Sequence, residues 1–150
     1  MAKSPEMKIL ERFVGTWDLE SKTIVPETKA KEAPLKGVAT VEWALGDRFI
    51  QYRCRMNGWE DLQLTMFDAG KKIYRHWNFN AEGGAVESTR ECHEEGDTIT
   101  WHGDLGDGRT EVLSFRFTDR DTLDWQNVVK DPTGQVLSDR KGKMTRRVEG

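Results

Sequence analysis

The hydrophobic and polar residues change their period close to Gly15. Before it, Met7, Leu10 and Phe13 recur at nearly helical spacing, which predicts an amphipathic helix of about ten residues. The preceding Ser4-Pro5-Glu6 supplies an N-cap hydroxyl, a proline for the first turn and an acid near the positive end of the helix dipole. After Gly15 apolar and polar residues alternate, which is typical of half-buried strands. A short helix followed by strands is therefore expected.

Turn residues divide the rest of the chain into short segments of similar length. Gly-Asp and Asn-Gly pairs such as Gly46-Asp47 and Asn57-Gly58 separate these segments, and none of the gaps is long enough for a parallel crossover. The pattern predicts an all-β fold: an antiparallel up-and-down β-barrel of about ten strands, with the N-terminal helix capping one end, as one domain over residues 1–150. The predicted strands are 16–25, 35–45, 48–57, 61–69, 71–80, 84–92, 97–103, 109–118, 121–130 and 135–147.

Alternation also predicts which side chains face the barrel interior. We expect Trp17 and Trp43 to pack in the core and the apolar set of each clearly alternating strand to point inward. These inward sets are Ile50, Tyr52, Cys54 and Met56; Leu62, Leu64 and Met66; Leu113, Phe115 and Phe117; and Leu123, Trp125 and Val129.

Two polar residues interrupt the predicted interior. In segment 71–80 the inward set would be Ile73, Arg75, Trp77 and Phe79, and Asn127 follows Trp125 in segment 121–130. A buried cation is costly unless it is paired, so either Arg75 forms a salt bridge or the register of its strand is shifted by one residue. Alternatively, Arg75 anchors a carboxylate or phosphate inside the cavity, because a planar guanidinium can bind an anion bidentately.

These residues together form the candidate ligand site. Arg75 and Asn127 would orient a polar head, and five aromatic rings would line the cavity around it. The rings are Tyr52, Trp77, Phe79, Phe115 and Trp125. The alternative is that the same rings only fill the core of a packed barrel.

Composition restricts the partners of the chain. Acids and bases are interspersed and the net charge is −3, which does not favour nucleic-acid binding. No run approaches the ~20 apolar residues of a membrane span, and the first eight residues contain no apolar run typical of a secretory signal. We therefore expect a cytoplasmic protein in which Cys54 and Cys92 are free thiols.

Motifs for metal or cofactor chemistry are weak. His76, His93 and His102 are predicted on outward faces, and the chain has no His-x-His or Cys-x-x-Cys pair, so no metal and no cofactor are expected. A shift of register would bring His76 or His102 inward, and one inward histidine is enough for an axial haem ligand. Segment 104–108 resembles a fragment of a calcium loop but lacks its further ligands, so a tight acidic turn is expected.

A catalytic set is also not evident. The chain has no Gly-x-Ser-x-Gly and no phosphate-binding loop. Any of several carboxylates on the predicted strands could act as an acid or base inside the cavity, and the sequence does not choose between them. These carboxylates are Glu42, Glu87, Glu91, Glu111 and Asp124.

The segment Phe13-Val14-Gly15-Thr16-Trp17, placed directly after a helix, resembles the start of proteins of the calycin superfamily, which includes lipocalins, fatty-acid-binding proteins and nitrobindins. Over roughly residues 7–146 the chain is similar to an uncharacterised bacterial family of single lipocalin-like domains. That similarity also rests on Leu45-Gly46-Asp47-Arg48-Phe49, on Phe67-Asp68, and on Tyr74 and Trp77. The resemblance implies a barrel around a cavity.

The expected function is non-catalytic binding of a small apolar or amphipathic molecule inside the barrel. Three alternatives remain: an isomerase or cyclase that uses a buried carboxylate, a haem-binding protein, and a structural or oligomerising module with a filled barrel. The expected partner is the small ligand, with no nucleic acid and no membrane span. A homo-oligomer is left open.

Overall fold

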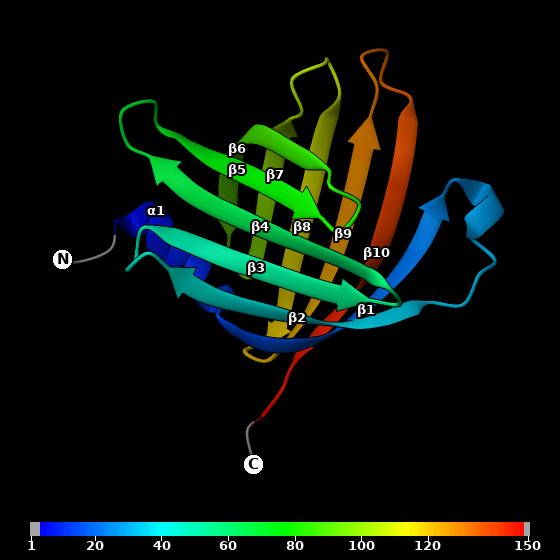
Figure 1. Cartoon of the computed structure of the whole chain (residues 1–150), viewed down its shortest axis with the longest axis horizontal. Coiled ribbons are helices and arrows are strands. Elements are labelled where there is room, and N and C mark those ends of the chain that lie inside the picture. The colour runs from blue at the N-terminus through cyan, green and yellow to red at the C-terminus, as the bar shows by residue number, and fades with distance from the viewer. Residues whose placement is uncertain (1–3, 149–150) are drawn as a thin grey trace.

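The computed structural model describes residues 4–148, and in this part of the chain ten antiparallel strands form one closed barrel. Each strand pairs with the next along the chain, and β1 closes the barrel by pairing with β10. In Figure 1 strands β2–β5 cross in front of β8–β10. The strands are β1 (Gly15–Val25), β2 (Leu35–Ala44), β3 (Phe49–Met56), β4 (Trp59–Asp68), β5 (Ile73–Asn80), β6 (Ala85–Glu95), β7 (Thr98–Asp104), β8 (Thr110–Asp119), β9 (Thr122–Lys130) and β10 (Val136–Arg146). The all-β, calycin-like barrel expected from the sequence is confirmed.

The N-terminal helical segment, Pro5–Phe13, is close to the predicted length of about ten residues, but it is not a single α-helix. One α-helical turn, α1 (Pro5–Lys8), is followed by a 3-10 helix, η1 (Ile9–Phe13). Ser4 caps α1 as expected, since its Oγ accepts a hydrogen bond from the Met7 amide at 3.2 Å. The Tyr74 hydroxyl of β5 donates to the Glu6 carbonyl at 2.8 Å, which ties α1 to the barrel wall. Among residues 4–148, no helix has the length and apolar character needed to cross a membrane.

The end of the barrel beside η1 is closed by Trp17. Its side chain is 0% exposed, and its indole Nε1 donates to the Phe13 carbonyl at 2.8 Å, so the buried N–H has a partner. The Arg146 guanidinium lies over the Trp17 ring at 4.2 Å and donates to the carbonyls of Val14 and Arg12. Gly15 has φ +139°, and a Cβ on it would approach Arg146 Nη1 to 2.6 Å, so glycine is required there.

The predicted inward faces are correct in three of the four strands for which an apolar set was assigned, and wrong in β4. Ile50, Cys54, Phe117 and Leu123 are buried in the core as expected. In β4 the inward residues are instead Asp61, Gln63 and Thr65, all of which line the cavity. Leu62, Leu64 and Met66 therefore point outward, because successive side chains of a strand alternate between its faces.

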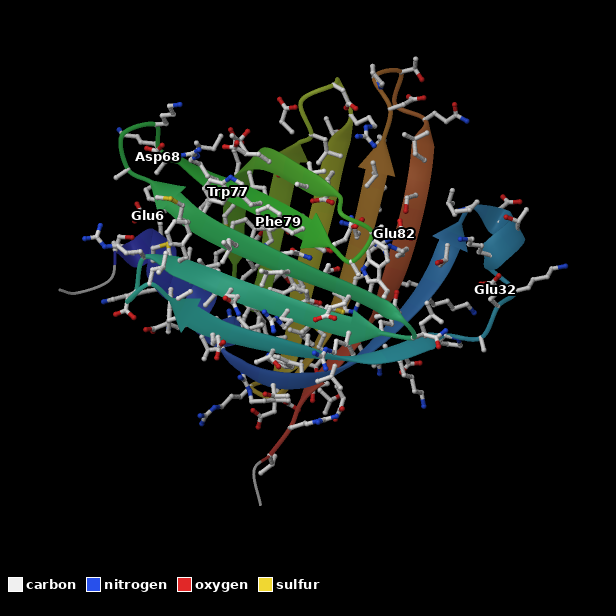
Figure 2. The ribbon with its side chains drawn as sticks, viewed as in Figure 1. Glu6, Glu32, Asp68, Trp77, Phe79 and Glu82 are labelled. Carbon is white, nitrogen blue, oxygen red and sulfur yellow. The ribbon has the colours of Figure 1, made fainter. Side chains whose placement is uncertain are left out.

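Strand β5 has the same inversion. Tyr74, His76 and Asn78 face the interior, whereas Arg75, Trp77 and Phe79 lie on the outside. Each outward residue of β5 lies opposite an apolar residue of β4, in the pairs Met66–Arg75, Leu64–Trp77 and Leu62–Phe79. The outward apolar side chains of β4 and β5 thus pack against one another on the outer surface of the barrel and do not contribute to the core. We call Phe49, Leu62, Leu64, Met66, Trp77 and Phe79 the outer apolar patch; Figure 2 labels Trp77 and Phe79.

Candidate functional site

A cavity of about 310 Å³ lies inside the barrel. That volume corresponds to roughly ten water molecules at ~30 Å³ each, so the cavity suits a small molecule. At the closed end its wall is apolar and includes Leu10 and Phe13 of η1. Towards the opposite end it is polar and includes Asp61 and Glu111, which stand near the starts of β4 and β8. The cavity is therefore amphipathic along the barrel axis.

A second hollow, of about 750 Å³, lies against β1, β9 and β10. It is open to solvent, and charged side chains such as Lys22, Arg116 and Lys141 contribute much of its wall. Binding pockets for small molecules are typically enclosed and largely apolar. The interior cavity is thus the better candidate site, although it is the smaller of the two.

Four of the sequence-predicted site residues meet in the cavity wall. Tyr52 of β3, Phe115 of β8, and Trp125 and Asn127 of β9 all line it. Asn127 is only 7% exposed, so its side-chain amide lies inside the barrel, as predicted. The Trp125 indole donates to the Glu20 carbonyl at 3.2 Å, which fixes the ring in the wall. Their role in binding stays a prediction.

The other three predicted site residues lie outside the barrel, so the prediction that they line the cavity is wrong. Arg75 Nη2 forms a 2.8 Å salt bridge with Glu87 Oε1, and its guanidinium lies 4.8 Å from the centre of the Trp77 ring. Trp77 and Phe79 belong to the outer apolar patch. The shift of register by one residue, considered as the alternative for this strand, is the correct interpretation. A one-residue shift moves every side chain of a strand to the other face.

Arg90 of β6 is a buried cation in the cavity wall, and the pattern of the sequence did not predict it. Arg90, Gly103 and Glu111 lie side by side on β6, β7 and β8. Because Gly103 has no side chain, Arg90 Nη2 reaches over it to Glu111 Oε1 at 2.8 Å. The side chains of this pair are only 11% and 15% exposed. Burial lowers the pKa of Arg90, and the neighbouring Glu111 carboxylate opposes that shift.

His76 lies beside Arg90 inside the barrel, which contradicts its predicted outward position. His76 is 3% exposed, and its Nδ1 is 2.9 Å from Thr65 Oγ1. Burial, together with the charge of Arg90, lowers the pKa of His76 from 6.5 to about 2, so the ring is neutral. Its Nε2 and the Nε of Arg90 are buried and have no hydrogen-bond partner among residues 4–148. His93 and His102 are exposed, as predicted.

Asp61 is the second carboxylate of the cavity, and it was also missed. It accepts hydrogen bonds from Trp59 Nε1 at 3.0 Å and Gln63 Nε2 at 3.4 Å. Burial raises its pKa, although the two donors act in the opposite direction. Opposite it on β3, burial raises the pKa of the Cys54 thiol to about 11. Cys54 is therefore a protonated, weakly reactive thiol, and both Cys54 and Cys92 are free as predicted.

The other candidate carboxylates lie outside the cavity. Of the five that the sequence left open, only Glu111 is part of the described cavity lining. Glu87 and Asp124 form ion pairs with Arg75 and Arg116 on the barrel surface. Among residues 4–148, the carboxylates of the cavity lining are thus Asp61 and Glu111.

Comparison with known proteins identifies the fold. No protein-family model matches the chain, and no curated protein matches its sequence. Among solved structures, Rv2717c from M. tuberculosis is similar with a TM-score of 0.67 at 12% identity, covering 98% of this chain and 100% of that one. The S-type phycobiliprotein lyase CPES from Guillardia theta is similar with a TM-score of 0.59 at 12% identity, covering 99% of this chain and 96% of that one. The chain thus adopts a calycin-like barrel, and at such low identity the likeness shows the fold alone.

Proposed function

We propose that the protein binds a small amphipathic molecule inside the barrel without transforming it. The observation that supports this most strongly is the 310 Å³ cavity, whose wall is apolar at the closed end and polar towards the other end. Packed interiors rarely contain voids much larger than a water molecule, so a cavity of this size indicates a binding site. The apolar end would take the hydrocarbon part of the ligand, and the polar wall would orient its head.

The size of the cavity limits the ligand. A molecule of about ten to fifteen non-hydrogen atoms would fill it, by comparison with the ~30 Å³ that one water molecule occupies in the liquid. A long-chain fatty acid or a larger ring system would extend beyond it. Medium-chain compounds and one-ring or two-ring aromatics are therefore the proposed ligand range.

Displacement of a small neutral two-ring dye whose emission depends on solvent polarity, such as 2-(dimethylamino)naphthalene, tests this proposal. Because the outer apolar patch could also bind a dye, two matched variants separate the surfaces: Leu113→Trp fills the cavity, and Leu64→Gln makes the patch more polar. We expect saturable binding that Leu113→Trp abolishes and Leu64→Gln preserves, with displacement by medium-chain compounds. Loss of binding in Leu64→Gln alone, or no saturable binding at all, would overturn the proposal.

A second candidate function is proton-transfer catalysis by Asp61. A carboxylate with a raised pKa beside a cavity is a typical general acid or base. Such a group would exchange the α-protons of a bound ketone with solvent, which proton NMR in D₂O detects. If the wild type accelerates this exchange and Asp61→Asn does not, the result favours an enzyme. If the wild type does not accelerate it, the result favours binding alone.

The haem alternative fits the cavity poorly. His76 is the one histidine in the described lining, and its ring is neutral, as an axial ligand must be. However, a cavity of about 310 Å³ is at the lower end of the range for drug-sized ligands, and a haem is larger than such ligands. The Arg90–Glu111 pair also occupies the wall beside His76. We therefore assign no haem chemistry to this site.

A further inference from the structure

Two neighbouring polar side chains of the cavity wall have no partner in the part of the chain that the structure describes. Asn127 of β9 and Arg140 of β10 both line the cavity, and neither side chain forms a hydrogen bond or an ion pair with any residue of 4–148. They lie directly opposite each other in the register of β9 and β10, on the inward face that also carries the buried Met144. Directly opposed residues have Cβ atoms about 4.5–5.5 Å apart, so one ligand can contact both.

Asn127 is buried, but its amide is open to the cavity. Within residues 4–148, the sealed side-chain atoms without a partner belong to His76 and Arg90, so the unpaired amide of Asn127 keeps accessible surface. The residue as a whole is only 7% exposed and lines the cavity, so that surface faces the cavity. Leaving a buried amide unpaired costs stability, and native proteins rarely do so without a reason. The amide is therefore placed to contact a molecule inside the barrel.

Arg140 brings a positive charge to the polar end of the cavity. Burial raises the pKa of Tyr52, Cys54 and Asp61, and the charge of Arg140 acts on all three in the opposite direction. These residues belong to β3 and β4, which do not pair with β10. The guanidinium therefore extends over the cavity towards them, where a ligand can reach it.

The acids of the cavity wall leave this charge without a counter-ion. Glu111 is paired with Arg90 at 2.8 Å. Asp61 accepts hydrogen bonds from two side chains of its own strand, β4, and forms no salt bridge with Arg140. An ammonium head would be repelled by Arg140, and a neutral head would leave its charge unbalanced. An anionic head completes the wall.

We infer that the cavity selects ligands with a carboxylate head, which accepts one hydrogen bond from the Arg140 guanidinium and another from Asn127 Nδ2. A carboxylate has two acceptor oxygens, and charge-assisted hydrogen bonds are stronger than those of a neutral carbonyl. The apolar part of the ligand would lie against the closed end of the barrel, where Leu10 and Phe13 form the wall. The inference rests on the proposed binding function and names the ligand class for the same cavity: medium-chain and small aromatic monocarboxylates.

A series of ligands with the same hexyl chain tests the head group. It consists of heptanoate, heptanamide, 2-octanone and 2-aminooctane, which have equal numbers of non-hydrogen atoms, and each competes with 2-(dimethylamino)naphthalene at neutral pH. A hydrogen bond to a charged group contributes roughly tenfold or more in affinity. We therefore expect heptanoate to bind about tenfold more tightly than 2-octanone, with heptanamide between them and 2-aminooctane weakest. Because Arg140 is exposed, added salt should weaken the binding of heptanoate and leave that of 2-octanone unchanged.

Substitutions connect this preference to the two side chains. Arg140→Gln removes the charge and should reduce the ratio of heptanoate to 2-octanone affinity about tenfold, whereas Arg140→Lys keeps the charge and should retain most of the ratio. Asn127→Leu replaces the amide by an apolar group of similar size and should reduce heptanoate affinity about threefold to tenfold relative to the dye. Arg53→Gln removes an exposed cation from the outer face of β3 and is the matched control, which should keep the wild-type ratio. Because each readout is a ratio within one protein, a moderate loss of stability does not affect it.

The outcomes separate this inference from the proposed function. If no member of the series displaces the dye, the binding function itself fails. If all members displace it equally, or if 2-octanone or 2-aminooctane binds most tightly, the cavity binds ligands but the carboxylate selection is wrong. A preference for heptanoate that persists in Arg140→Gln, or that falls equally in Arg53→Gln, would also overturn the inference.

Discussion

Replacement of His76 should make the protein less sensitive to acid. In the unfolded chain a histidine takes up a proton as the pH falls through about 6.5, whereas burial holds the folded pKa of His76 near 2. Between these values the unfolded state binds the extra proton, so stability rises with pH in that window. The contribution of the neutral His76 is thus complete above pH 6.5 and is lost progressively as the pH falls.

The size of the effect at a working pH depends little on how low the folded pKa lies. At pH 4.5 the unfolded histidine is two pH units below its pKa, and each unit is worth about 1.4 kcal/mol. His76 should therefore reduce the free energy of unfolding by about 3 kcal/mol between pH 7 and pH 4.5. This is a large fraction of the ~5–15 kcal/mol that stabilises a typical domain.

Urea denaturation of the wild type and His76→Asn at pH 7 and pH 4.5 measures this difference. We expect the variant to be less stable than the wild type at pH 7, because it loses packing, and to lose about 3 kcal/mol less on acidification. His102→Asn, an exposed position, should follow the wild type. Parallel losses of stability in the wild type and His76→Asn would show that His76 is protonated in the folded state and would refute the reasoning.

Three further predictions test the barrel wall. Leu64→Gln, on the outer face, should reduce the free energy of unfolding by about 1 kcal/mol or less. Leu123→Ala, which empties a fully buried position, should reduce it by about 2–5 kcal/mol. Similar reductions in the two variants would contradict the outward orientation of Leu64 in β4. Gly103→Val should separate Arg90 from Glu111 and reduce the free energy of unfolding by about 3 kcal/mol or more. Gly103→Ala places a Cβ at 3.5 Å from Glu111, an ordinary contact, so the reduction should be much smaller. Titration with haem should produce no new Soret band, and a sharp stoichiometric band would show that the cavity opens enough to hold it.

The positions of the strands could be predicted from the sequence because the turns are encoded locally. Gly58 and Gly96 have positive φ in two of the predicted turns, and Asp131 accepts hydrogen bonds from the backbone amides of Thr133 and Gln135 in a third. The inward faces of β3, β8 and β9 could be predicted because their apolar residues do face the core. These strands supply Tyr52, Phe115, Trp125 and Asn127 to the cavity.

The faces of β4 and β5 could not be predicted by the same rule. The rule assumes that the apolar side of a strand is the buried side, but a cavity keeps polar groups inside and leaves apolar groups to pack on the outer wall. One signal was present in the sequence: Phe67 is out of phase with Leu62, Leu64 and Met66. In the structure its ring lies 5.0 Å from that of Tyr74, in a directly opposed pair of the inverted face. His76 was predicted on an outward face for the same reason.

Intermolecular NOEs between a bound ligand and the methyl groups of the protein test the central claim most directly. With saturating 2-octanone, the binding account predicts NOEs to Val41 and Leu113, whose side chains line the cavity. The methyl groups of Leu62 and Leu64, on the outer apolar patch, should show none. NOEs confined to Leu62 and Leu64, or none to any methyl group under saturating conditions, would contradict a ligand site inside the barrel.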